Sequence, residues 1–147
     1  MGKLVDKLKN YSRIAIDTNS FIYLMERNEK YFNEVREMFR LIESGSVFAI
    51  SSMLLITEVL TKPYKDGDIL LANRYKAFIS AFPNLYLKNI DYNVLVLTAK
   101  MRARYGLKTP DAIFIASALE EKAEAFVTND IRLRKINEIE FIILDEI

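Results

Sequence analysis

The chain has 147 residues, 51% of them hydrophobic, and a formal net charge of +1, which predicts one globular domain spanning residues 1–147. It contains no Cys and no His, so disulfides, thiolate or imidazole zinc sites and Ser-His-Asp or Cys-His catalysis are excluded. No apolar run reaches the roughly 18 residues of a membrane span, and Asp17 interrupts the apolar stretch that a signal peptide would need. We therefore expect a cytoplasmic protein without a membrane partner, whose chemistry uses carboxylates, amides, hydroxyls, Lys, Arg or bound ions.

Short apolar segments alternate along the chain with stretches of helical periodicity. The predicted strands are Arg13–Ile16, Val47–Ile50, Leu85–Leu87, Ala125–Val127 and Glu140–Leu144. The predicted helices are a short one from residue 17 to about 27, then 31–44, 51–60 with a break at Pro63, 66–82, 91–105, 109–119 and a short one after residue 130. This alternation predicts an α/β fold, with a central parallel sheet of about five short strands and helices on both faces.

The segment Lys108–Leu119, which reads K-T-P-D-A-I-F-I-A-S-A-L, begins like a helix. Thr109 is a candidate N-cap, and Pro110 suits the first helical position. Apolar side chains then cover nearly every side of the helix, which predicts that it is buried. Asp111 is the carboxylate at its start: it either complements the helix dipole, worth about 0.3–1 kcal/mol, or belongs to a functional site.

Topology alone predicts that three acids from separate segments converge. In a parallel sheet with right-handed crossovers, the carboxyl ends of all strands meet at one edge, and ligands bind outside that edge. Asp17 and Asp130 each follow a predicted strand, and Asp111 begins a helix that leads into a strand, so all three belong at this edge. Glu58 lies about 9 Å into its predicted helix and reaches the edge only if that helix crosses over the end of the sheet. A Glu on the solvent face is the alternative.

Such a cluster of acids needs compensation. Two carboxylates about 5 Å apart repel each other by roughly 3 kcal/mol at an effective dielectric constant of 20. The cluster must therefore take up protons or bind cations, and ligation by oxygen alone selects Mg²⁺ or Mn²⁺. Two such ions can align a water molecule and a leaving oxygen for in-line attack at a phosphodiester.

These residues resemble the PIN-domain ribonucleases, and especially the VapC-type toxins of toxin-antitoxin pairs, over almost the whole chain. The resemblance implies that Asp17 of D-T-N and Glu58 of T-E-V-L are the first and second metal-binding acids. It implies that Asp111 of T-P-D-A-I-F-I-A-S-A-L and Asp130 of V-T-N-D are the third and fourth. The four acids would thus be catalytic as well as metal-binding.

The same resemblance implies an activity and partners. Asn19 and Thr128 look like the polar residues that orient the acids, and Asn129 like a residue that shapes the turn. The implied activity is metal-dependent endonuclease cleavage of RNA, with Mg²⁺ or Mn²⁺ as cofactor. The implied partners are RNA, a second copy of the chain and an antitoxin protein.

Charge is unevenly distributed in a way that suits a nucleic acid. Residues 62–108 contain nine basic and three acidic residues, a net charge of +6, whereas residues 111–130 have a net charge of −4. Lys100, Arg104 and Lys108 follow helical spacing and are predicted to contact RNA phosphates on one face. Dipole complementation at a helix C-terminus, with ordinary solvation, is the alternative.

The hydrophobic content also predicts self-association. We expect some apolar side chains of the middle segments to face a partner subunit, among them Leu54, Leu55, Tyr64, Phe78 and Phe82.

Two other functions stay open at this stage. A phosphatase or phosphotransfer domain would use Asp17 as nucleophile, but the haloacid-dehalogenase pattern requires a second Asp two residues later, where this chain has Asn19. A non-catalytic binding module with the same fold would have no use for four mutually repelling acids.

Overall fold

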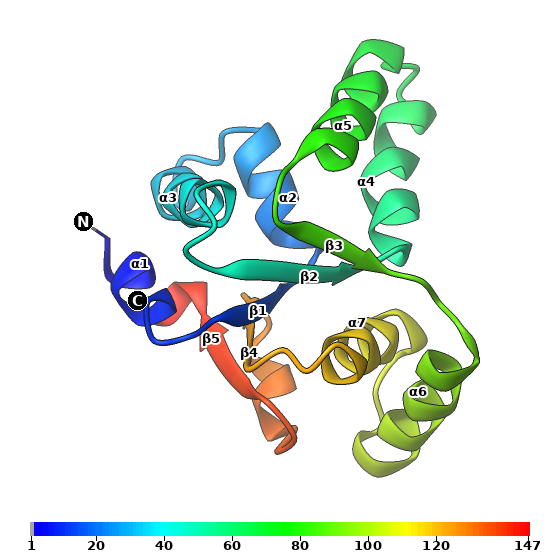
Figure 1. Ribbon diagram of the computed structural model, residues 1–147. Helices are drawn as coiled ribbons and strands as arrows, with labels where there is room; N and C mark the ends of the chain where they lie inside the picture. The colour runs from blue at the N-terminus through cyan, green and yellow to red at the C-terminus, as the bar shows by residue number, and fades with distance from the viewer. Residues whose placement is uncertain (1) are drawn as a thin grey trace.

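The computed structural model describes residues 2–147 and contains one five-stranded sheet in which every strand pairs in parallel (Figure 1). The strands are β1 (Arg13–Ile16), β2 (Phe48–Ser52), β3 (Leu85–Lys88), β4 (Ala125–Thr128) and β5 (Glu140–Ile143). Their order across the sheet is β3-β2-β1-β4-β5. The chain therefore builds one half of the sheet outward from β1 and then returns to β4 on the other side of β1. The predicted parallel α/β fold is confirmed.

Helices cover both faces of this sheet, because crossovers of one hand that run in opposite directions lie on opposite faces. The helices are α1 (Lys3–Leu8), α2 (Thr18–Met25), α3 (Phe32–Glu43), α4 (Leu54–Lys65), α5 (Ile69–Ala81), α6 (Tyr92–Tyr105) and α7 (Thr109–Glu120), with 3₁₀ helices η1 (Ile131–Lys135) and η2 (Leu144–Glu146). The α2–α3 pair lies on one face and the α6–α7 pair on the other, while α4 and α5 project together beyond the sheet (Figure 1).

Helix α7 is the buried centre of its layer, as its sequence predicts. All seven residues from Ala112 to Ala118 are buried, and the hydroxyl of Ser117 bonds to the carbonyl of Ile113 within the helix at 2.7 Å. A helix with no polar face can only be stable between other elements. Asp111 is therefore held by a rigid, enclosed element.

Two local predictions are wrong, and one of the helices is not predicted from the sequence. Pro63 does not break its helix, since α4 continues to Lys65; the proline lies in the last turn, where its missing N–H costs a single hydrogen bond. Thr109 is the first residue of α7 and does not cap it: Lys108 occupies the N-cap position without a side-chain bond, and Pro110 lies one place later than predicted. Helix α1 was not predicted, although it buries Leu4, Val5 and Leu8.

The predicted partner-facing set is partly wrong. Leu55 is fully buried in the core. Phe78 and Phe82 pack against Phe39 with ring centroids 5.7 and 5.4 Å apart, so their rings are engaged within the fold. Leu54 is also partly buried against the core, and Tyr64, with 48% exposure, is the member that faces solvent. None of the helices formed by residues 2–147 is long and apolar enough to cross a membrane.

Candidate active site

The site lies where the strand order reverses. Strands β1 and β4 are neighbours, yet the chain leaves β1 toward β2 and leaves β4 toward β5, so the following segments diverge and open a crevice. Asp17 directly follows β1 as the N-cap of α2, and Asp130 lies two residues beyond the end of β4. The topology thus brings two acids to one crevice from opposite ends of the sequence.

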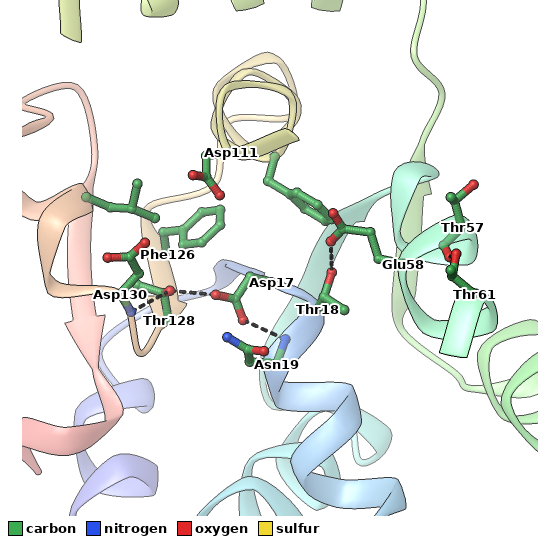
Figure 2. Close-up of a pocket in the computed structure, with 12 residues that line it drawn as sticks. Asp17, Thr18, Asn19, Thr57, Glu58, Thr61, Asp111, Phe126, Thr128 and Asp130 are labelled. Carbon is green, nitrogen blue, oxygen red and sulfur yellow. Dashed lines mark hydrogen bonds between the residues drawn. The ribbon is translucent and has the colours of Figure 1, made fainter. Parts of the chain in front are cut away.

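The crevice contains a cavity of about 520 Å³, and all four predicted acids line it (Figure 2). Asp17 lies between Thr128 on one side and Glu58 on the other, with Asp111 above it in the view of Figure 2. The full lining consists of Asp17, Thr18, Asn19, Thr57, Glu58, Thr61, Asp111, Phe114, Phe126, Thr128, Asp130 and Leu133.

Asp17 is the carboxylate most enclosed by protein. Burial raises its pKa to about 6, although the hydroxyl of Thr128 donates to it at 2.5 Å and the amide of Asn19 at 3.2 Å. The nearby Asp111 carboxylate raises the pKa of Asp17 further. A charge so poorly solvated, and held by two donors, is a strong attractor for a cation.

Thr128 and Asn19 orient Asp17 by different means. Fully buried Thr128 also accepts from the amide of Asp130 at 3.1 Å, so one hydroxyl fixes Asp17 and the turn that carries Asp130. Asn19 lines the cavity with its side chain but contacts Asp17 through its main-chain amide.

Glu58 reaches the site because α4 begins at Leu54, immediately beyond the end of β2. Glu58 is therefore little more than one turn into the helix, and the hydroxyl of Thr18 donates to its carboxylate. Thr57 and Thr61 of the same helix add two hydroxyls to the lining. The sequence indicates none of the three threonines by itself, because Thr is common on exposed helix faces.

Asp111 and Asp130 face each other across the same cavity and differ in electrostatic environment. Burial raises the pKa of Asp111, with the Asp130 carboxylate as the second cause. The pKa of Asp130 is lowered, chiefly because the Arg132 guanidinium bonds to it in a fork, at 2.9 and 2.7 Å. Arg132 was not predicted as a site residue: its contact with Asp130 depends on the tight turn that starts η1.

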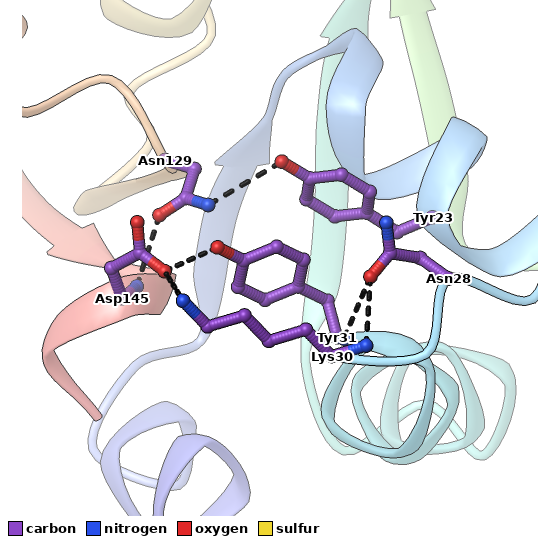
Figure 3. Close-up of polar contacts among 6 residues, drawn as sticks. All are labelled: Tyr23, Asn28, Lys30, Tyr31, Asn129 and Asp145. Atoms are coloured by element: carbon purple, nitrogen blue, oxygen red, sulfur yellow. Dashed lines mark hydrogen bonds and ion pairs between the residues drawn. The ribbon is translucent and has the colours of Figure 1, made fainter.

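A network of side chains holds the turn that carries Asp130 against α2 and the C-terminal segment (Figure 3). The side chain of Asn129 donates to Tyr23 at 3.4 Å and accepts from the amide of Asp145 at 3.0 Å. Tyr23 stacks on Tyr31, with ring centroids 4.5 Å apart, and Tyr31 donates to Asp145. The Asn129 side chain thus ties the turn that carries Asp130 to α2 and to the C-terminal segment.

The predicted basic stripe is not one surface. Helix α6 ends at Tyr105, and Gly106 takes a left-handed φ of 68° that turns the chain, so Lys108 does not continue the face of Lys100 and Arg104. Arg104 instead pairs with Glu138 at 3.0 Å. Lys108 lies near Asp111 and Asp130: its positive charge partly offsets the burial that raises the pKa of Asp111, and adds to the Arg132 bond that lowers the pKa of Asp130.

The donor set suits a hard divalent cation. Within residues 2–147, no three acids are gathered closely enough to hold one ion by themselves. Mg²⁺, however, is usually held by one or two carboxylates and keeps several of its waters. Asp17 with Asp111, and Asp111 with Asp130, are electrostatically coupled neighbours in a cavity with room for a hydrated ion. The residues present therefore fit Mg²⁺ or Mn²⁺.

The comparisons with known proteins agree with this fold. The PIN domain family matches residues 14–139, and the chain belongs to that family. Curated protein sequences give no match.

Several solved toxin-antitoxin structures share the fold. They include VapBC2 from Rickettsia felis bound to a promoter DNA fragment, with a TM-score of 0.68, 15% identity and coverage of 88% of this chain and 97% of that one. A toxin-antitoxin complex from Klebsiella pneumoniae gives a TM-score of 0.67 at 19% identity, and the match covers 89% of this chain and 97% of that one. DNA-bound VapBC from Salmonella typhimurium gives a TM-score of 0.66 at 21% identity, and the match covers 90% of this chain and 98% of that one.

Proposed function

We propose that this protein is a metal-dependent endoribonuclease of the VapC toxin type, which hydrolyses phosphodiester bonds in RNA. The observation that carries the proposal is the convergence of Asp17, Glu58, Asp111 and Asp130 on one cavity at the switch point of a PIN-family sheet. A phosphatase that uses Asp17 as nucleophile is disfavoured, because the residue two positions later is Asn19 and not the acid that such an enzyme requires.

Each of the four acids contributes a carboxylate to the binding of the ions. Asp17, Asp111 and Asp130 come from rigid elements on three sides of the cavity, and Glu58 completes the lining from α4. Divalent ions bound there supply positive charge that orients a water molecule and stabilises the charge developing on the scissile phosphate. Burial raises the pKa of Asp17, and the hydrogen bond from Thr128 partly opposes that rise while it fixes the orientation of the carboxylate.

A cleavage assay tests the proposal directly. The wild-type chain, incubated with labelled single-stranded RNA, is expected to cleave it in Mg²⁺ or Mn²⁺ and to stop when EDTA removes the ions. Ca²⁺ serves as the control, because it has a different preferred coordination geometry and should support less cleavage. Cleavage that persists unchanged in EDTA would exclude a metal-dependent mechanism.

Arg132 competes with a cation for Asp130, which gives a second expectation. Arg132→Ala should strengthen Mn²⁺ binding by up to about fivefold, since an exposed ion pair is worth roughly 0.2–1 kcal/mol. The measurement is a Mn²⁺ titration followed by thermal stability, which rises with ligand occupancy. Arg134→Ala is the matched control, because Arg134 lies in the same helix η1 and pairs with Glu146 instead. Equal Mn²⁺ affinity in both variants would show that Arg132 does not restrict the site.

Control by an antitoxin protein is part of the proposal. It is supported by the likeness of the fold to chains of VapBC and other toxin-antitoxin complexes, which this chain matches over 97–98% of their length. A non-catalytic module that only binds such a regulator is the alternative, and the cleavage assay separates the two.

A homodimer is also proposed, on a different surface from the one that the sequence indicates. Helix α6 exposes Tyr92, Leu95 and Val96, at 80%, 49% and 37%, with Leu95 and Val96 about one helical turn from Tyr92. Apolar side chains at this spacing are usually covered by a partner.

A further inference from the structure

A second, smaller cavity of about 120 Å³ adjoins the acidic one and has the opposite charge on its outer rim. The two cavities share Asp111, Asp130 and Leu133 as a common wall. Beyond that wall, the small cavity is lined by Lys108, Arg132 and Lys135. Basic side chains from the α6–α7 connection and from η1 thus converge beside the acids, although they are far apart in sequence.

The two lysines of this rim have no acidic partner in the part of the chain that the structure describes. Lys108 and Lys135 are exposed, and neither forms an ion pair with a carboxylate of residues 2–147. Arg132 differs, since Asp130 holds its guanidinium. Two positive charges that form no ion pair within the described residues therefore lie next to the acidic cavity.

The backbone at the start of α7 also favours the binding of an anion. Lys108 is the N-cap of α7, a helix of twelve residues whose first turn receives no side-chain cap. The N–H groups there are free to bond an anion, and the helix dipole favours one. Pro110 contributes no N–H, so the donors of this turn are few and the lysines must supply most of the attraction.

We propose that this basic cavity, formed by Lys108, Arg132 and Lys135, binds a backbone phosphate of the RNA strand next to the phosphate at the acids. The inference rests on the proposed ribonuclease function and names the path of the substrate. The strand crosses the wall of Asp111 and Asp130 from the acidic cavity into the basic one. Lys108 and Lys135 contact phosphate oxygens. Arg132 lies between Asp130 and the strand, so its guanidinium can leave the Asp130 carboxylate and bind a phosphate.

A phosphate site beside the acids would help the protein to hold its RNA substrate. An empty acidic cavity repels RNA, so contacts outside it must hold the strand before and during cleavage. Phosphate contacts of this kind position a nucleic acid without reading its sequence. The basic cavity therefore fixes the register of the strand over the acids, whatever the base sequence.

The test is RNA binding as a function of salt concentration, in EDTA so that no cleavage occurs. The probe is a short fluorescent single-stranded RNA, and the variants are Lys108→Ala, Lys135→Ala and their combination. Each lost contact should weaken binding several-fold and reduce the slope of log affinity against log salt by about 0.7, so the double variant should lose about 1.4. Lys135→Arg keeps the charge and should restore both affinity and slope.

Lys7→Ala is the matched control, because Lys7 is an exposed lysine of α1 that lines neither cavity. It should bind RNA with the wild-type slope. If the wild type binds RNA and the double variant keeps its affinity and slope, the basic cavity is not a phosphate site, even where cleavage in Mg²⁺ is normal. If instead the double variant shows the predicted loss but the wild type cleaves nothing in Mg²⁺ or Mn²⁺, the phosphate site stands and the ribonuclease assignment falls.

Discussion

Asp17→Asn is expected to lower the rate of RNA cleavage by at least two orders of magnitude while RNA binding is retained. Asp17 is the acid at the centre of the cavity, and its neutralisation removes the charge that attracts ions beside the scissile phosphate. Electrostatic groups that act on charge developing in the transition state are worth several kcal/mol, and each 1.36 kcal/mol is a factor of ten. Binding should be equal or stronger, because the RNA is itself negatively charged.

The measurement is single-turnover cleavage at saturating RNA in Mn²⁺, with binding measured on the same preparations. Asp91→Asn is the matched control: Asp91 is also the N-cap of a helix, α6, but lies outside the acidic cavity. It should cleave at the wild-type rate. An Asp17→Asn chain that cleaves as fast as Asp91→Asn would remove Asp17 from the catalytic machinery.

The positions of three of the four acids follow from the sequence by topology. Asp17 and Asp130 end adjacent parallel strands, and Asp111 begins a helix that returns to the same edge, so secondary structure alone brings them together. Glu58 is different. Its approach depends on how α4 leaves β2, which the local sequence does not determine, and the resemblance to PIN ribonucleases supplied its position.

The electrostatic partners could not be predicted, because they depend on side-chain geometry between distant segments. The spacing of Lys100, Arg104 and Lys108 suggested one face, but Gly106 turns the chain between them. The sequence does not single out Arg132 and Lys135, because a short 3₁₀ segment carries no periodic signal, and only the fold places them beside Lys108. Sequence periodicity predicts faces within an element, whereas sites form between elements.

Asp17→Asn is also expected to stabilise the ion-free protein near neutral pH. The folded-state pKa of Asp17 is raised to about 6 from an ordinary value of 3.8, mainly by burial. The native state therefore binds the proton more tightly than the unfolded state, so stability from this group is lost as the pH rises from 3.8 to about 6. Since one pKa unit is 1.36 kcal/mol, the loss near pH 7 is at most about 3 kcal/mol, and access of water through the cavity reduces it.

Denaturant unfolding in EDTA, between about pH 4 and pH 7, measures this effect. The Asp17→Asn chain should exceed the wild type in free energy of unfolding near pH 7, and the difference should shrink toward pH 4 as Asp17 of the wild type takes up its proton. Asp91→Asn should behave in the opposite sense. The pKa of Asp91 is lowered, first by the amide of Val94, so its charged form stabilises the fold and its removal should cost stability near neutrality. A wild type that is more stable than Asp17→Asn at pH 7 without ions would show that the Asp17 charge is well accommodated by the fold alone. The cavity would then have no need of a cation.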